Sequence, residues 1–360
     1  MKVREPGLDI CRIGAMVMIT ILHVNNQYLG LLNRSLPAGQ YTAGYLIEYL
    51  CFCGVNCFAL LSGYLLGEQK WHYDGKWFER CAGLWMKLVI WGVLLNAAGV
   101  LFVNSNGSGW AWSYFKVILC PPFGYWWYIS AYFGLLTLVP LMNHFIAGAK
   151  PVLLLRVSLI FFFFFSILPI WMQSEGSTGL TYGYSTLWLA VCYVWGAALK
   201  RFMPRIMKIK HIVPICTGTA IFCVVFPTVF NLYGGSDTPR LFMNYLSPLC
   251  VLEAVALLII SLRIKISGNA ANRIITFLSV NSLGIYLFQC HAAVWGGFVY
   301  RENPPVISSR ELLWRFPLVV LGLIAAGICC NVVIGKLYSW LRIGMLVRWC
   351  SGKIFPQPEE

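Results

Sequence analysis

The chain has 360 residues, of which 59% are hydrophobic and 11% charged, whereas soluble globular domains carry about 25% charged residues. This composition and the mean hydropathy of +0.71 exclude an ordinary soluble protein and indicate an integral membrane protein. The formal net charge of +14 would suggest nucleic acid in a soluble chain, but here the Lys and Arg residues lie mainly between apolar segments, as in loops beside an anionic leaflet.

Ten apolar segments are candidates to cross a bilayer, whose core requires about 20 residues of helix. In chain order they are residues 9–30, 42–67, 81–103, 125–147, 151–173, 186–202, 212–233, 241–262, 274–299 and 315–341. We therefore predict an all-α fold, a polytopic membrane bundle of about ten transmembrane helices. A single transmembrane domain covers residues 1–345, a short cytoplasmic tail covers 346–360, and no soluble domain is expected.

The basic residues predict the orientation, because cytoplasmic loops are enriched in Lys and Arg. With the N-terminus in the cytoplasm, the inner segments hold 21 of the 27 Lys and Arg residues. Those left outside are Arg34, Lys116, Arg240, Arg301, Arg310 and Arg315. A different number of spans would place many more of these Lys and Arg residues in outer loops. We therefore predict ten spans with both termini cytoplasmic.

The first predicted span carries a polar stripe. Arg12 lies at its inner end, and a rise of about 1.5 Å per residue places His23 about 16 Å further on, near the middle of a core about 30 Å thick. Helical periodicity puts the following residues on one face: Asp9, Arg12, Met16, Ile19, His23 and Gln27. Such a stripe faces protein or water rather than lipid, which makes it a functional candidate. The alternative is that His23 only hydrogen-bonds across helices and Arg12 only snorkels.

The second predicted span contains Asn56, Ser62 and Tyr64 within the segment VNCFALLSGYLLG. Gly63 and Gly67 form a small-xxx-small face in the same segment, and close helix packing explains these glycines without any chemistry.

Glu253 lies near the middle of the eighth predicted span, where a carboxylate is costly. It could pair with His23 or Arg12, or it could be protonated and structural. Both alternatives are open from the sequence.

Two further segments contain Tyr or Gln side chains that could contribute hydrogen-bonding groups to a functional site. Tyr128 begins the fourth predicted span, where an aromatic belt at the membrane interface explains it equally well. Tyr286 and Gln289 share one face of the ninth predicted span because they are three residues apart.

Several chemistries find no support in the sequence. The 14 Cys residues include no paired CxxC beside a His, and Cys51, Cys53 and Cys57 sit within an apolar run, so no metal site is expected. Gly-rich phosphate loops, HExxH and GxSxG motifs are also missing from the sequence.

Four segments in order resemble the acyltransferase-3 family of integral membrane proteins. They are LDICRIGAMVMITILH, with its Arg, ten residues and His, then VNCFALLSGYLL, FGYWWYISAYFGLLTLVPLMN and SLGIYLFQCH. The resemblance extends over most of the chain and agrees with the ten-span layout. One departure is that many members have His three residues after the late Tyr, whereas this chain has Gln289 there and His291 two residues later.

The resemblance implies an O-acyltransferase of the plasma membrane, most simply of a bacterial cell. Such enzymes move an acyl group, usually acetyl, from cytoplasmic acyl-CoA to a hydroxyl of an extracytoplasmic glycan or lipid-linked envelope molecule. The same module occurs in glycan O-acetyltransferases and in vancomycin-resistance serine racemases. Acetyl-CoA is then the expected donor substrate, no metal or nucleic acid is expected, and the oligomeric state is not predicted.

The resemblance to this family also implies catalytic and binding roles for the candidate residues. His23 is suited to act as general base, because an imidazole exchanges protons near neutral pH, and Glu253 is the second catalytic candidate. Arg12 could bind a phosphate or pantetheine carbonyl of the donor, with Arg80 and Lys87 adding charge for the CoA phosphates. The candidates for the acyl tunnel or acceptor site are Asn56, Ser62, Tyr64, Tyr128, Tyr286 and Gln289.

Two other functional classes remain open from the sequence. A transporter or flippase for a small polar solute or lipid-linked sugar would also use ten spans with buried His and Glu, although such folds often show internal repeats. A non-catalytic membrane sensor or assembly partner would show no turnover and would tolerate loss of His23.

Overall fold

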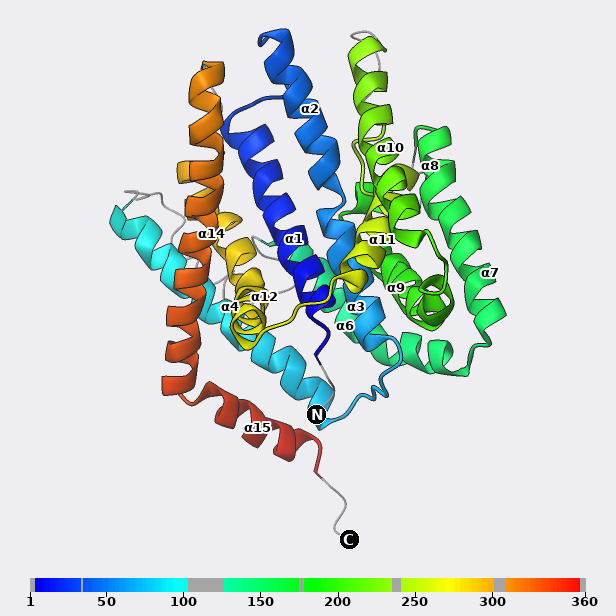
Figure 1. Ribbon diagram of the computed structural model, residues 1–360. Coiled ribbons are helices and arrows are strands. Elements are labelled where there is room, and N and C mark those ends of the chain that lie inside the picture. Colours follow the sequence, from blue (N-terminus) through cyan, green and yellow to red (C-terminus); the bar gives the residue numbers. More distant parts are fainter. Residues whose placement is uncertain are drawn as a thin grey trace.

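The computed structural model describes residues 4–33, 35–102, 126–174, 176, 178–234, 241–300 and 308–356. Every regular element in these ranges is a helix, which confirms the predicted all-α class (Figure 1). The α-helices are α1 (Pro6–Leu22), α2 (Ala38–Phe52), α3 (Gly54–Leu66), α4 (Gly75–Phe102), α6 (Trp127–Gly148), α7 (Pro151–Phe162), α8 (Leu168–Trp171), α9 (Thr186–Ile206), α10 (Ile212–Tyr233), α11 (Pro248–Arg263), α12 (Asn269–Gln289), α13 (Ala292–Val294), α14 (Ser309–Trp340) and α15 (Ile343–Ile354). The π-helical segments η1 (His23–Tyr28), η2 (Phe163–Ile167) and η4 (Trp295–Val299) continue α1, α7 and α13, and a 3-10 turn, η3 (Thr181–Gly183), precedes α9.

The predicted spans coincide with these helices, but not all of them qualify as membrane spans. Among the described residues, seven helical segments are long and apolar enough to cross a membrane, and the pair α12 and α13–η4, bent by 62°, makes an eighth if the two together form one span. The α11 helix has 16 residues, or about 24 Å, which is shorter than a bilayer core of about 30 Å. The α9 helix carries Lys200 and Arg201 near its C-terminal end, which lowers its hydropathy. Ten spans with cytoplasmic termini therefore stay a prediction.

Large apolar side chains cover the outside of several helices. Leu159 on α7 is 59% exposed, Phe222 on α10 is 55% exposed and Leu321 on α14 is 63% exposed. A soluble monomer rarely exposes extended apolar surface of this kind, whereas a bilayer accommodates it. The outer surface therefore agrees with a membrane protein.

The helices α3 and α9 pack against each other at the centre of the bundle. A Cβ on Gly63 would collide with the backbone of Tyr193, and a Cβ on Gly196 would collide with the backbone of Leu60. Gly67 faces Ala197 one turn further along. The small-xxx-small face noted in the sequence is thus the surface on which these two helices meet.

Replacing Gly63 with alanine is expected to destabilise the protein by about 1–3 kcal/mol, because the added methyl group pushes α3 away from the backbone of α9. Thermal unfolding in detergent measures the effect. Gly218→Ala on α10 is the matched control, since nothing lies within 4 Å of the Cβ position there. The control should be neutral or slightly stabilising; equal unfolding temperatures for the two variants would contradict the packing argument.

Residues 346–354 of the predicted tail lie in a helix, α15, which begins at Ile343. Arg342 adopts a left-handed conformation, with φ of 53°, and turns the chain from α14 into α15. The α15 helix lies at the same end of the bundle as the start of α1 (Figure 1). The Ser351 hydroxyl donates to the Gly75 carbonyl at 3.1 Å and so fixes α15 to the first residue of α4.

Candidate active site

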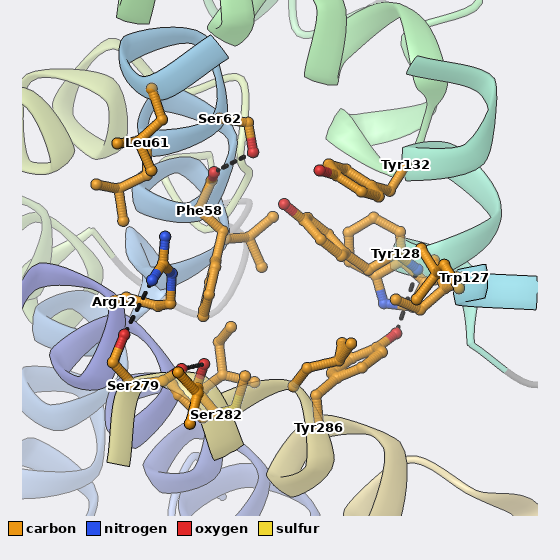
Figure 2. Close-up of a pocket in the computed structure, with 18 of the residues that line it drawn as sticks. Arg12, Phe58, Leu61, Ser62, Trp127, Tyr128, Tyr132, Ser279, Ser282 and Tyr286 are labelled. Carbon is orange, nitrogen blue, oxygen red and sulfur yellow. Dashed lines mark hydrogen bonds between the residues drawn. The ribbon is translucent and has the colours of Figure 1, made fainter. Parts of the chain in front are cut away.

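A cavity of about 510 Å³ opens among α1, α3, α6 and α12; we call it the Arg12 cavity. Helix α1 contributes Arg12, Met16 and Ile19 to its lining and η1 contributes His23, at the spacing that the sequence places on one face. The other hydroxyl-bearing side chains in the lining are Ser62, Tyr128, Tyr132, Tyr245, Ser279, Ser282 and Tyr286. Figure 2 shows Arg12 on one wall, with Tyr128 and Tyr132 opposite and Ser279 and Ser282 below it.

The Arg12 guanidinium is held by a short network at the start of α1. Its Nη1 donates to Asp9 Oδ1 at 3.2 Å and to the Ser279 hydroxyl at 2.9 Å, and Ser279 donates to the same carboxylate at 2.6 Å. Arg4 also donates to Asp9, so two guanidinium groups share one carboxylate. This end of the cavity therefore carries surplus positive charge, which suits an anionic ligand.

His23 is the first residue of the π-helical segment η1, which follows α1 without a break. Its ring meets the edge of Trp295, with ring centroids 4.8 Å apart. The Gln289 side chain lies next to the imidazole, although Nδ1 is buried without a hydrogen-bond partner of standard geometry among the described residues. The η1 segment forms the last turns of this helix, and π-helical turns are rare and occur frequently at functional sites.

A second cavity, of about 450 Å³, lies beyond His23; we call it the Glu48 cavity. Its polar lining includes Asn26, Gln27 and Glu48, and its aromatic lining consists of Phe52, Trp127, Tyr184, Tyr245 and Trp295. The two cavities share the lining residues Ile19, His23, Trp127 and Tyr245. The imidazole of His23 therefore lies on the boundary between them.

Glu253 lies elsewhere, since it lines neither of these two cavities. Its side chain is 2% exposed on α11 and lies beside Cys53, and Cys57 and Cys250 are also close to it. No contact links this carboxylate to His23 or Arg12 among the described residues, so the structure gives no support to the pairing considered from the sequence, and a catalytic role of Glu253 stays a prediction.

Asn56 is a structural link and does not line either cavity. Its amide nitrogen donates to the Tyr245 carbonyl at 2.8 Å and lies 3.2 Å from Cys250 Sγ, and its amide oxygen accepts from Trp188 Nε1 at 2.9 Å. Asn56 thereby ties α3 to α9 and to the loop before α11. The prediction that it lines the tunnel or acceptor site is corrected to a supporting role.

Replacing Asn56 with alanine is expected to destabilise the fold by about 1–3 kcal/mol, because it leaves the buried Trp188 Nε1 and Tyr245 carbonyl groups without these partners. Thermal unfolding in detergent measures the loss. Thr219→Ala, at a half-buried position on α10 where the hydroxyl bonds only within its own helix, should change stability by less than about 0.5 kcal/mol. An unaltered unfolding temperature for Asn56→Ala would contradict this role.

The four remaining site residues predicted from the sequence lie outside the linings of both cavities. Tyr64 lies outside both cavities, with Lys200 Nζ 4.7 Å from its ring centroid. Arg80 stacks on Trp71 at 4.4 Å, yet it is near enough to act electrostatically on Tyr132 in the Arg12 cavity. Lys87, on α4, does not line the Arg12 cavity. Gln289 lies behind His23, outside the lining of both cavities.

Several cavity residues were not identified from the sequence. Tyr132 follows Tyr128 by one helical turn, so the i, i+4 spacing could have revealed it. Tyr184 and Tyr245 lie in loops before α9 and α11, where no periodicity marks them. The aromatic residues Trp110, Trp112 and Tyr114, between the third and fourth predicted spans, lie outside the described residues.

A family model described as an acyltransferase domain matches residues 5–336, a range that contains every residue lining the two cavities. Neither the curated proteins nor the solved structures include a match to the chain.

Proposed function

Because the chain belongs to the acyltransferase-3 family, we propose that it moves an acyl group, most simply acetyl, from cytoplasmic acyl-CoA to a hydroxyl of an extracytoplasmic glycan or related envelope molecule. The proposed location is the plasma membrane of a bacterial cell. The observation that carries the proposal is the position of His23 on the boundary between two cavities. A group there can meet a donor that enters from one side and an acceptor that enters from the other.

The Arg12 cavity is the proposed donor site. Arg12 and the surplus positive charge around Asp9 suit the CoA phosphates, with Arg80 near the same cavity. Arg12 and His23 are separated by about 16 Å along the helix, a distance that an extended pantetheine arm can bridge. Ser62, Ser279 and Ser282 offer hydroxyl groups to the amides of that arm.

His23 is the proposed general base. Its imidazole takes the proton of the acceptor hydroxyl while the hydroxyl oxygen attacks the thioester carbonyl. The tetrahedral intermediate then collapses, the carbon–sulfur bond breaks, and the CoA sulfur leaves as a thiol with the proton from the imidazolium. Tyr286 accepts a hydrogen bond from the Tyr128 backbone N–H at 3.2 Å, so its own hydroxyl proton can be donated to the developing oxyanion.

The test is acyl transfer by the purified protein in detergent, with radiolabelled acetyl-CoA and envelope glycans extracted from the host. We expect thiol release together with label incorporated into the glycan fraction. Purified protein that binds solute but releases no CoA would contradict the proposal and favour a transporter. Thiol release without labelled glycan would retain the donor and overturn the acceptor class.

A further inference from the structure

Two guanidinium groups share the Asp9 carboxylate at the start of α1, and the geometry divides it unequally between them. Arg4 pairs with both carboxylate oxygens, whereas Arg12 reaches only one. We infer that Arg4 is a positioning residue for the donor site: it occupies Asp9 and so keeps the Arg12 guanidinium available to an anionic donor. The inference rests on the proposed function, because it identifies the residue that keeps the proposed acyl-CoA site open.

The pair of Arg4 and Asp9 is bidentate. Arg4 Nε donates to Asp9 Oδ2 at 2.5 Å and Nη2 donates to Oδ1 at 3.0 Å, so the planar fork of the guanidinium faces both carboxylate oxygens. Two parallel charge-assisted hydrogen bonds make this the most favourable geometry between an arginine and a carboxylate. Asp9 is 4% exposed, so water competes little for its oxygens. The carboxylate is therefore bound chiefly to Arg4.

Arg12 contacts the same carboxylate through one nitrogen only. Its Nη1 lies 3.2 Å from Asp9 Oδ1, the longest of the four hydrogen bonds that this carboxylate accepts from the described residues, and also donates to the Ser279 hydroxyl at 2.9 Å. Figure 2 shows one terminal nitrogen of Arg12 directed to Ser279 and the other directed away from it.

The other two nitrogens of the guanidinium, Nε and Nη2, donate to none of the residues that the structure describes. Arg12 lines the cavity, and its side chain is 28% exposed. The N–H groups on these two nitrogens are therefore available to a ligand in the Arg12 cavity, and they retain the fork that matches a phosphate.

Arg4 does not line the Arg12 cavity itself. It precedes the first residue of α1, and its side chain is 46% exposed. Its effect on a ligand in the cavity therefore passes through Asp9. Asp9 and Arg12 are three residues apart on one helix, so without Arg4 the carboxylate could form the bidentate pair with Arg12 instead. Such a pair would neutralise Arg12 and occupy its fork.

Binding of CoA tests the inference without any turnover. The protein in nanodiscs is titrated calorimetrically with CoA, as wild type, Arg4→Gln, Asp9→Asn and the double variant. Arg4→Gln should raise the Kd by about tenfold, because Asp9 then pairs with Arg12. In the Asp9→Asn background no carboxylate competes for Arg12, so the same substitution should change the Kd by less than about twofold.

The dependence on background separates a positioning residue from the alternatives. Arg4→Gln that weakens binding equally in both backgrounds would show that Arg4 contacts CoA directly, and would overturn the inference. A lower unfolding temperature with an unchanged Kd would show a purely structural role, and would also overturn it. Arg315→Gln is the matched control, since it removes the guanidinium of another ion pair, with Glu311 on α14, outside both cavities. Its Kd should equal that of the wild type.

Arg4→Lys serves instead if Arg4→Gln fails to fold. The ammonium keeps the charge but cannot form the bidentate pair, so the Kd should rise by about threefold in the wild-type background and stay unchanged in the Asp9→Asn background. Equal shifts in both backgrounds, or no shift in either, would overturn the inference.

The same titration separates this inference from the proposed function. CoA binding that depends on Arg4 and Asp9 as expected, without acyl transfer in the transfer assay, would contradict the acyltransferase proposal and leave the inference intact. Acyl transfer by a protein in which Arg4→Gln leaves CoA binding unchanged would overturn the inference and leave the proposed function intact.

Discussion

Replacing His23 with alanine is expected to lower the rate of acyl transfer by about 10²–10⁴-fold, the usual contribution of a positioned general base. The imidazole lies where the two cavities meet, and the lining residues that they share offer no second imidazole. The loss should appear in kcat, with little change in the KM for acetyl-CoA, because the donor-binding groups near Arg12 are untouched. Steady-state thiol release in detergent, with extracted envelope glycans as acceptor, measures both constants.

The control for this variant is His144→Ala, since His144 is an exposed residue on α6 and lines neither cavity. It should retain full activity. Unfolding temperatures of both variants show whether a loss of rate reflects loss of structure. Full transfer activity in a correctly folded His23→Ala protein would overturn the role of the imidazole.

Replacing Arg12 with alanine should raise the KM for acetyl-CoA by about 10–150-fold, which corresponds to the loss of a hydrogen bond to a charged group, about 1.5–3 kcal/mol. Asp9 would keep its contacts with Arg4 and Ser279, so the start of α1 should remain folded. Arg12→Lys keeps the charge but loses the planar fork, and we expect an intermediate KM.

The measurement is the KM for acetyl-CoA at several salt concentrations. The wild-type value should rise with ionic strength, and that dependence should weaken in Arg12→Ala because one phosphate contact is lost. Arg273→Ala, an exposed position on α12 outside the cavity, is the matched control. An unchanged KM in Arg12→Ala would place the donor elsewhere.

The part of the site on α1 follows directly from the sequence. A helix returns to the same face every three to four residues, so the spacing of Arg12, Met16, Ile19 and His23 is sufficient to place them on one cavity wall. The periodicity changes at His23, where the π-helical segment begins. From this segment Asn26 and Gln27, three and four residues after His23, line the Glu48 cavity.

The rest of the site depends on how distant segments pack. Ser279 meets Arg12 across 267 residues of chain, and Tyr245 reaches the cavities from a loop whose position Asn56 fixes from α3. Glu253 is equally informative, because its mid-span position predicts burial but not the cysteines that surround it. Burial of a polar group can be inferred from one helix, whereas its partners are set by the arrangement of the whole bundle.

The membrane spans show the same difference between what one segment of sequence predicts and what the packing of the bundle decides. Hydropathy locates all ten helical segments, yet a short helix such as α11 can be surrounded by protein without crossing the bilayer. Helix length and composition alone therefore leave the number of crossings at seven or eight among the described residues.

The central claim, that His23 joins a donor cavity to an acceptor cavity, is tested most directly by sided transfer in sealed proteoliposomes. Radiolabelled acetyl-CoA is enclosed in the lumen, envelope glycans are supplied outside, and vesicles with the protein in the required orientation are selected by an epitope tag. The account predicts labelled glycan outside and free CoA inside, with both lost in His23→Ala and retained in His144→Ala. Label transfer that occurs only when donor and glycan share one compartment would contradict it.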